Sequence, residues 1–400
     1  MDTTKNKRTR LLDLTRLLSR AGQVMTGVDR VEFAYLCRFL EDDTDCFFLV
    51  RTAYGYVLLD REGGQLIKQA CETGDWGRPD LLSRLRRKMP VAVQSAQTLA
   101  RHFRIARCGN GRLALMLAEH LPEAVDFYNV GHTNLTTAYF VALRQVADIR
   151  ITIMVHDVIP LELPEMQEPR TIKRFEDLMR SVSEFADRVI AISDAAADSM
   201  IGPFRRFGRL PPITVAHLGV TVPVPRYAEI PEYLDLSEPY FVTVGTIEPR
   251  KYHALLLELW QAMPDDSKPK LLICGRRGWL NHSVFEQLDR GVDRVVELPD
   301  LSDDALAAVV HGAKGLLFPS VAEGFGLPPV EAAALGVPVV CADLPVYRET
   351  LGDTGVYLDP QDNYSWRETI KQLMAEDDGE REPYVVPPTW SSHFDTVLDQ

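Results

Sequence analysis

The residues best suited to chemistry lie in the second half of the chain, in the segment PSVAEGFGLPPVEAAALGVPVV from Pro319 to Val340. An apolar run typical of a buried strand ends at Phe318, and a loop with two glycines follows it. We expect a helix to begin near Pro328, because the first helical position needs no amide hydrogen, and to end at Gly336. The N-terminus of such a helix attracts anions, so the segment predicts a phosphate-binding site.

Four residues of this segment are candidates for that site. The amides of Gly326 and Leu327 lie at the predicted helix N-terminus, while Glu323 lies in the loop and Glu331 in the first turns of the helix. Two carboxylates that flank a bound diphosphate can accept hydrogen bonds from sugar hydroxyls on either side of it. Alternatively, Glu331 only complements the helix dipole, and Glu323 is a solvated loop residue. The glycines and the preceding strand favour the binding site.

A second motif, GTIEPRK from Gly245 to Lys251, directly follows the first predicted strand of this half. Ligands of open α/β sheets bind at the carboxyl ends of strands, which is where this loop lies. Arg250 and Lys251 can clamp a diphosphate and stabilise the negative charge that develops on it as it leaves a sugar. The alternative is an ordinary basic pair at a helix start. The helix dipole disfavours cations there, so we prefer the functional interpretation.

Short apolar strands alternate with helical segments throughout this half of the chain. A segment such as LSDDALAAVVHGA has apolar residues at helical spacing and acidic residues at its start. Continuous apolar strands separated by helices indicate a parallel sheet that is covered on both faces, as in a Rossmann-like domain. The predicted strands are Phe241–Val244, Leu271–Cys274, Val295–Leu298, Gly315–Phe318 and Val337–Val340.

The first half repeats this α/β pattern less regularly. CFFLVRTAYGYVLLD, from Cys46 to Asp60, predicts two strands joined by a Tyr-Gly-Tyr turn. The spaced prolines of Val220–Pro239 predict a linker. We therefore expect one domain over 1–222, a linker over 223–239 and a second domain over 240–400, whose last helix packs back on the first. Further strands are predicted at Asp126–Gly131, Ile151–Asp157, Arg188–Ser193 and Ile213–Gly219.

These motifs together resemble family 4 of the glycosyltransferases, which are retaining enzymes. The resemblance rests on GTIEPRK, on CGRRGW and on the two glutamates of EGFGLPPVE, and it continues through VHDVIPL, DRVIAISDAAADSM and VAHLGV in the first half. Upstream, MTGVDRVEFAYL resembles the glycine loop and helix of the family. The resemblance implies the GT-B architecture, in which two Rossmann-like domains face a central cleft.

The family assigns roles to the residues of the second half that match its motifs. Glu323 would bind hydroxyls of the donor sugar, and the amides of Phe325–Leu327 would hold the sugar and its phosphates. Glu331 would bind the ribose of the nucleotide. Arg250 and Lys251 would neutralise the leaving diphosphate.

Four more residues complete the predicted set. Gly245 and Thr246 would contact the donor at the end of the first strand of the second domain. Many relatives have an arginine where this chain has Thr246, which places more of the diphosphate neutralisation on the basic pair of GTIEPRK. In the first domain, His156 would face the donor sugar, and Gly27 would let its loop approach the diphosphate or the acceptor closely. From the sequence alone, His156 could equally be a structural residue.

We predict neither a metal ion nor another cofactor. The acidic pair around Thr44, in Asp43–Asp45, has the spacing of a metal-binding DxD, but it lies in an acidic patch and fits solvated charge better. His132, in NVGHTNL, fits a structural role better than a catalytic one. No lysine-bearing motif suggests pyridoxal phosphate.

Composition excludes several classes of protein. A net charge of -13 argues against a nucleic-acid binder, since phosphate neutralisation requires a basic surface. The six cysteines are widely spaced and form no CxxC pair, which suggests a reducing compartment. The basic N-terminus lacks the apolar stretch of a signal peptide, and no run is long enough to span a membrane. We therefore expect a cytoplasmic protein.

The expected function is retaining transfer of a hexose from a nucleotide sugar, with mannose from GDP-mannose as the first candidate, to a saccharide or lipid-linked acceptor in bacterial surface polysaccharide synthesis. The alternatives are an epimerase or a phosphorylase of the same fold, or a scaffold that only binds nucleotide sugar.

One segment suggests where the protein works: residues 78–112 hold nine basic residues and one acidic residue, a local charge of +8. Apolar residues lie among them, and Pro90 is expected to split the segment into two helices. A basic amphipathic segment predicts peripheral binding to anionic membranes, although a solvated basic face, or one paired with the acidic second domain, would look the same.

Overall fold

The computed structural model describes residues 8–265, 268–376 and 381–398. The chain forms two compact units. The first contains the residues through His156 together with 173–191 and 200–215, and the second contains 157–172, 192–199 and the chain from Ala216 onward. The predicted linker at 223–239 falls within the second unit, and the domain boundary itself stays a prediction.

The first unit is built on an eight-stranded sheet with the strand order β4-β3-β2-β1-β5-β6-β7-β8. All neighbouring strands are parallel except β3, which is antiparallel to both β2 and β4. The antiparallel β2–β3 hairpin confirms the two predicted strands, but the turn between them is Ala53–Tyr54, because Gly55 and Tyr56 of the predicted Tyr-Gly-Tyr turn already pair with Thr52 and Arg51. The strands are β1 (Thr9–Asp13), β2 (Cys46–Thr52), β3 (Gly55–Leu59), β4 (Ala106–Cys108), β5 (Val125–Asn129), β6 (Ile149–Val155), β7 (Arg188–Ala191) and β8 (Ile213–Val215).

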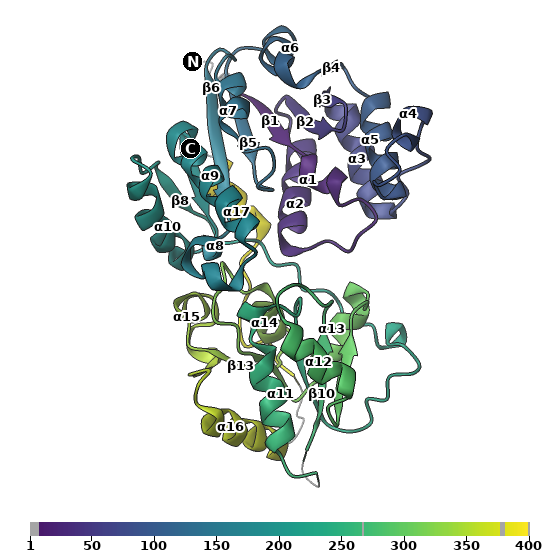
Figure 1. Cartoon of the computed structure of the whole chain (residues 1–400), viewed down its shortest axis with the longest axis vertical. Coiled ribbons are helices and arrows are strands. Elements are labelled where there is room, and N and C mark those ends of the chain that lie inside the picture. Colours follow the sequence, from purple (N-terminus) through teal and green to yellow (C-terminus); the bar gives the residue numbers. More distant parts are fainter. Residues whose placement is uncertain (1–7, 266–267, 377–380, 399–400) are drawn as a thin grey trace. The chain divides into compact units, whose positions relative to one another are not determined.

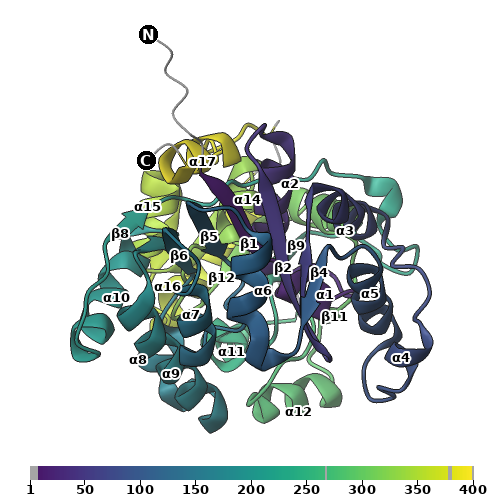
Figure 2. The same ribbon diagram turned by 90° about the horizontal axis from the view of Figure 1, so that it is seen from above.

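Helices flank this sheet. α3 and α5 contact each other and the β2–β3 hairpin, and Figure 2 shows them together beside that part of the sheet. The predicted break at Pro90 is confirmed, because Pro90 immediately precedes α5, while α4 before it is a single turn. The helices whose residues lie mainly in the first unit are α1 (Thr15–Ser19), α2 (Gly27–Glu41), α3 (Arg61–Thr73), α4 (Leu81–Arg84), α5 (Val91–His102), α6 (Leu113–His120), α7 (Thr137–Leu143), α9 (Pro169–Phe185) and α10 (Asp194–Arg206).

The second unit is built on a six-stranded sheet with the order β11-β10-β9-β12-β13-β14, parallel throughout. The predicted strands are confirmed, with shifts of at most two residues. Residues of β9, β10 and β12 pack with α11 and α16 into a core that contains Trp260 and Trp366. The strands are β9 (Tyr240–Val244), β10 (Lys270–Cys274), β11 (Val295–Leu298), β12 (Gly315–Phe318), β13 (Val339–Ala342) and β14 (Val356–Leu358).

The helices of the second unit from α11 onward appear in green to yellow in Figure 1, and α8, which comes earlier in the chain, appears in teal. The last one, α17, packs beside the segment that follows β8: the ring of Trp390 lies against Gly219, and the Nδ1 of His393 is 2.9 Å from the carbonyl oxygen of His217. None of the described helices combines the length and the apolar character that crossing a membrane requires. The helices are α8 (Ile159–Glu162), α11 (His253–Ala262), α12 (His282–Arg290), α13 (Asp303–His311), α14 (Leu327–Ala334), α15 (Pro345–Leu351), α16 (Asn363–Ala375) and α17 (Trp390–Leu398).

Candidate functional site

The two predicted motifs meet at one edge of the second sheet. β9 and β12 are neighbouring parallel strands, so the loops that follow them leave the sheet side by side. GTIEPRK follows β9, and the glycine loop follows β12. The two loops are joined through the backbone oxygen of Arg250, which accepts a hydrogen bond of 2.8 Å from the amide of Val321.

Arg250 links three parts of this edge. Its Nε lies 2.7 Å from a carboxylate oxygen of Glu248, and its Nη1 donates to the carbonyl of Ala322 at 2.9 Å and to Oε1 of Glu323 at 2.6 Å. These bonds fix the guanidinium in one orientation. The neighbouring carboxylates Glu323 and Glu248 outweigh the effect of burial and raise the pKa of Arg250.

Lys251 converges on the same carboxylate. Its Nζ donates to Oε1 of Glu323 at 2.5 Å and lies 4.5 Å from the centre of the Phe318 ring. Its side chain is only 10% exposed. Burial lowers the pKa of Lys251, an effect that Glu323 opposes. The ammonium is therefore held at a fixed place beside Arg250.

Glu323 is the centre of the cluster. The hydroxyl of Ser320 also donates to its Oε1, at 2.6 Å. Burial alone would raise the pKa of Glu323, but Arg250, Lys251 and these hydrogen bonds lower it to about 2. The carboxylate is thus ionised at any physiological pH, and one of its oxygens is shared by two cations and a hydroxyl.

The predicted anion site at the start of α14 has the expected backbone. Gly326 is the residue before the helix, with a φ of 84°, and Leu327 is its first residue. Two prolines follow, so the amides near this end belong to Leu327 and the loop before it. The ring of Phe325 is buried edge-to-face against His217, which orients this loop. Glu331 lies further along the same helix.

Glycines allow the loops after β9 and β10 to pack closely against each other at this edge of the sheet. Gly245 has a φ of 140°, and its amide donates to the carbonyl of Cys274 at 2.9 Å. A Cβ on Gly275 would lie 2.0 Å from the carbonyl oxygen of Gly245, so the loops after β9 and β10 need glycine there. Thr246, beside them, is exposed. The loop can therefore present its backbone and the Thr246 hydroxyl to a ligand.

The predicted residues of the first unit have other surroundings. His156 is buried after β6, and its Nε2 lies 2.7 Å from the carbonyl oxygen of Val130. The ring of His132 is 5.0 Å from that of His156, and burial lowers the pKa of His132 to about 3. Gly27 is the first residue of α2, after a capping box made by Thr26 and Asp29.

The predicted solvated character of the DxD segment fits its surroundings, since Asp43 and Asp45 are both exposed. Among the described residues, one group of side chains lies within metal-binding range of one another: Asp194, His217 and Glu349. Glu349, however, accepts hydrogen bonds from the amides of Asp194 and Ala195 at the start of α10, and from His217 at 2.6 Å. This carboxylate therefore acts as a helix cap.

Two members of the cluster were missed from the sequence. Glu248 is buried and is the second counter-ion of Arg250, although it lies within GTIEPRK. Ser320 is fully buried and lies within the glycine-loop segment. Their places in the two motifs were the available signals, but nothing in the spacing showed that either would turn inward.

Comparisons with known proteins relate part of the chain to one family. Residues 230–384 match the family described as "Glycosyl transferases group 1". The matched residues cover less than half of the chain and lie wholly within the second unit. Over 242 residues the chain is 31% identical to the serotype-specific mannosyltransferase WbdA of Escherichia coli, a match that covers 56% of this chain and 29% of WbdA. It is 28% identical over 230 residues to the O-antigen chain mannosyltransferase B of Escherichia coli, covering 56% of this chain and 60% of that protein. The chain thus spans less than two thirds of either relative.

Solved structures extend the likeness to both units of the chain. HepE of Anabaena, solved with UDP and glucose, matches 98% of this chain and 94% of its own length, with a TM-score of 0.61 and 15% identity. Sucrose-phosphate synthase of Thermosynechococcus elongatus matches 92% and 90%, with a TM-score of 0.58. At this identity the likeness concerns the fold, and it confirms the predicted GT-B fold of two α/β domains.

Proposed function

We propose that this protein is a glycosyl transferase that moves a hexose from a nucleotide sugar to a saccharide or lipid-linked acceptor, with retention at the anomeric carbon. The observation that carries the proposal is the convergence of Arg250, Lys251 and Ser320 on Glu323, next to the amides at the start of α14. Two fixed cations beside a helix N-terminus form a site for a diphosphate, and the carboxylate beside them accepts hydrogen bonds from a sugar.

In this mechanism Arg250 and Lys251 stabilise the charge that builds up on the diphosphate as its bond to the anomeric carbon breaks. The acceptor hydroxyl attacks the same face of that carbon, and its proton passes to the departing phosphate oxygen. The two cations do the electrostatic work that a metal ion does in other transferases. Further donor contacts are assigned to Gly245, Thr246, the amides of Phe325–Leu327, and Glu331 on the ribose.

His156 and Gly27 of the first unit complete the proposed site. His156 would turn its ring toward the donor sugar, and Gly27 would allow close approach of the diphosphate or the acceptor. The hydrogen bond between His156 and the carbonyl of Val130 supports a fixed ring orientation, which a positioning role requires.

GDP-mannose is the proposed donor, and surface polysaccharide synthesis in the bacterial cytoplasm is the proposed setting. Both rest on the relatives described as mannosyltransferases of O-antigen chains. The neighbours solved with UDP share 15% identity and support the fold rather than the base.

We further propose that the basic segment 78–112 attaches the protein to the cytoplasmic face of an anionic membrane. Leu81, Leu85 and Val91 are 81%, 73% and 67% exposed around the turn between α4 and α5, and Arg86–Lys88 lie in the same turn. Exposed apolar side chains flanked by cations are typical of surfaces that bind anionic lipid.

The experiment that tests the transferase is a thermal-shift screen of GDP-mannose, GDP, UDP-glucose and UDP, followed by product analysis with methyl α-D-mannopyranoside as acceptor. A bound donor raises the melting temperature by mass action. We expect GDP-mannose to stabilise the protein and to yield an α-linked product. Inverted product, or conversion of the donor without acceptor to an epimer, would overturn the proposal, and binding without any turnover would indicate the scaffold.

A further inference from the structure

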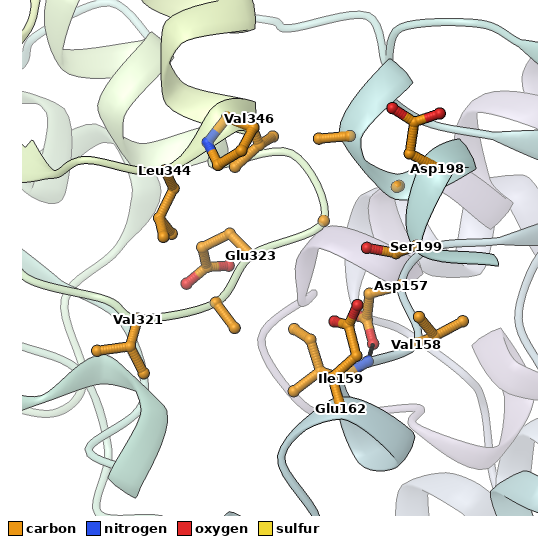
Figure 3. Close-up of a pocket in the computed structure, with 15 residues that line it drawn as sticks. Asp157, Val158, Ile159, Glu162, Asp198, Ser199, Val321, Glu323, Leu344 and Val346 are labelled. Carbon is orange, nitrogen blue, oxygen red and sulfur yellow. Dashed lines mark hydrogen bonds between the residues drawn. The ribbon is translucent and has the colours of Figure 1, made fainter. Parts of the chain in front are cut away.

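A second feature of the site is a pocket of about 280 Å³ that Glu323 lines together with the residues on either side of it in the glycine loop. Its walls come from the loop after β6, the first turns of α10, the glycine loop and the start of α15. Figure 3 shows Glu323 on one side of the pocket and Asp157, Glu162 and Ser199 on the other. Every lining residue belongs to the second unit.

The polar groups of this pocket are almost all hydrogen-bond acceptors. Its lining contains four carboxylates, Asp157, Glu162, Asp198 and Glu323, and neither lysine nor arginine. Burial raises the pKa of Asp157, Arg250 lowers it, and the neighbouring Glu323 and Glu162 raise it again. Glu323 and Glu162 therefore lie close enough to Asp157 to act on it electrostatically. A ligand that completes this pocket brings hydrogen-bond donors, and a phosphate or carboxylate would be repelled.

The remaining surface is apolar. Nine of the fifteen lining residues are Ala, Val, Ile, Leu or Pro. Such walls suit the CH face of a sugar ring better than a bare cation, which binds among oxygen ligands and water. Ligand pockets commonly measure about 300–1,000 Å³, so a volume near the lower end suits a single ring.

The walls are tied together, so the pocket is largely preformed. The hydroxyl of Ser193 donates to the carbonyl of Gly324 at 2.7 Å, which joins the start of α10 to the glycine loop. Glu349 of α15 accepts the amides of Asp194 and Ala195, at 2.7 and 3.0 Å. A preformed site loses less entropy when it binds a ligand.

We propose that this pocket binds an uncharged sugar ring of the acceptor, through hydroxyl donation to Asp157, Glu162 and Asp198. The proposal rests on the transferase function, since Glu323 is shared between the pocket and the diphosphate clamp. A ring held there lies beside the position at which the clamp holds the donor. Glu162 and Asp198 are positioned at the rim, where they select the acceptor without touching the donor.

The test compares the double variant Glu162→Gln/Asp198→Asn with a matched control, Glu232→Gln/Asp395→Asn, whose residues are exposed elsewhere in the second unit. Ligand-observed NMR with methyl α-D-mannopyranoside measures binding directly, and GDP affinity is measured in parallel. A hydrogen bond to a charged group is worth a factor of about ten or more in affinity. We expect the pocket variant to bind the mannoside at least about tenfold more weakly, with GDP affinity within about twofold of wild type, and the control to match wild type in both.

Charged probes separate the remaining outcomes. Mannose 6-phosphate should fail to displace the mannoside at concentrations at which unlabelled mannose does. The proposal is overturned if the pocket variant binds the mannoside like wild type, if GDP affinity falls together with mannoside affinity, or if protonated glucosamine binds and the mannoside does not. Failure of the transferase proposal would show as absent turnover with every donor, while the binding readout would remain interpretable.

Discussion

At the scale of single residues, the site is organised by the sharing of one carboxylate oxygen. Arg250, Lys251 and Ser320 all donate to Oε1 of Glu323, at 2.6, 2.5 and 2.6 Å. The same two cations are the groups that the proposed mechanism directs at a diphosphate. The diphosphate must therefore compete with Glu323 for them, and binding redistributes the pairing rather than filling a site of free charge. This competition ties donor binding to the position of Glu323.

A pair of isosteric variants separates the roles of the two glutamates. Glu323→Gln removes the competing charge, so we expect GDP affinity to be kept or to rise by up to about tenfold, while transfer falls by about two orders of magnitude. Glu331→Gln should instead weaken GDP binding by about tenfold, because its proposed partner is the ribose. Isothermal titration with GDP and initial-rate assays measure the two effects. Equal losses of GDP affinity in both variants would contradict the assignment.

The second prediction concerns Lys251. We expect Lys251→Ala to lower transfer by about two or more orders of magnitude, as loss of one charge-stabilising donor commonly does. Lys371→Ala is the control, because that lysine is exposed on α16 and pairs with Glu368 of the same helix. The melting temperatures of both variants check the fold. Turnover near that of wild type in Lys251→Ala would remove Lys251 from the site.

The sequence was sufficient to predict the residues of the site, because the two motifs specify their types and their order along the chain. It could not show that the carboxylate of Glu323 pairs with the two cations, or that the side chain of Glu248 is buried. Both depend on the directions that side chains take across two loops. Asp157 lies in the VHDVIPL motif, but the sequence could not place it in the pocket, because the pocket is lined by segments that are far apart in the chain.

At the scale of elements, the start of α14 requires a glycine, because the residue before the helix has a left-handed backbone and little room for a side chain. Gly326 has a φ of 84°, and a Cβ there would lie 2.8 Å from the Cε1 of Tyr347. We expect Gly326→Ala to lower the free energy of unfolding by about 2–3 kcal/mol, from the backbone conformation and the contact together. Gly291→Ala is a matched control that should lose about 1 kcal/mol: its φ is 82°, and a Cβ there would have no atom of the described residues within 4 Å apart from its chain neighbours. Urea unfolding followed by circular dichroism measures both, and equal losses would dismiss the contact with Tyr347.

The start of α11 predicts a dependence of stability on pH. His253 is buried, and among the described residues neither of its ring nitrogens has a hydrogen-bond partner. Burial lowers the pKa of His253 to about 3, with a smaller contribution from Lys251. Between its ordinary pKa of 6.5 and about 3, the unfolded chain takes up a proton that the folded chain does not. Stability should therefore fall as the pH drops through this window, by up to about 1.4 kcal/mol per pH unit.

His253→Leu removes this linkage while keeping the position apolar and filled. We expect the variant to be at least as stable as wild type at pH 7 and to lose less stability between pH 6.5 and 4.5. Melting temperatures across that range measure the difference. Parallel curves for the two proteins would show that His253 does not contribute.

The elements themselves were predictable where an apolar run is long or regular. The strands β9 to β13 of the second sheet and the β2–β3 hairpin follow from such runs, whereas the three-residue edge strand β14 was not predicted. β1 was missed, although it is central in the first sheet, because its five residues contain only two consecutive leucines among charged residues. Leu11 and Leu12 are both fully buried, so pairing with β2 and β5 decides this strand rather than any local pattern.

At the scale of the whole molecule, charge is unevenly distributed. The chain carries -13, yet residues 78–112 carry +8. Two of the charges in this count belong to an ion pair, because Arg101 is buried and lies 2.8 Å from Asp80. Burial alone would raise the pKa of Asp80, but the pairing lowers it to about 2. That pair cancels internally, and the other eight basic residues of the segment are exposed. The local field is therefore as strong as the sequence suggested, although an extended amphipathic helix does not produce it: α4 is one turn, and residues beyond α5 form β4.

Because each exposed Lys or Arg near an anionic surface contributes about 1 kcal/mol, this segment can hold the protein on a membrane despite its net negative charge. We expect co-sedimentation with vesicles that contain anionic lipid at low salt and release at high salt, since the attraction is screened within about 10 Å at 0.1 M salt. Arg86→Gln/Arg87→Gln/Lys88→Gln should weaken binding by about tenfold or more. The matched triple variant Arg170→Gln/Lys173→Gln/Arg174→Gln removes the same charges from exposed positions on α9 and should bind like wild type.

The double variant Leu81→Ser/Leu85→Ser tests the apolar side chains of the segment and should weaken binding at both salt concentrations. If both charge variants bind equally, net charge governs the association and the turn between α4 and α5 has no special part in it. If the wild-type protein does not co-sediment with the vesicles, the proposed membrane attachment is wrong.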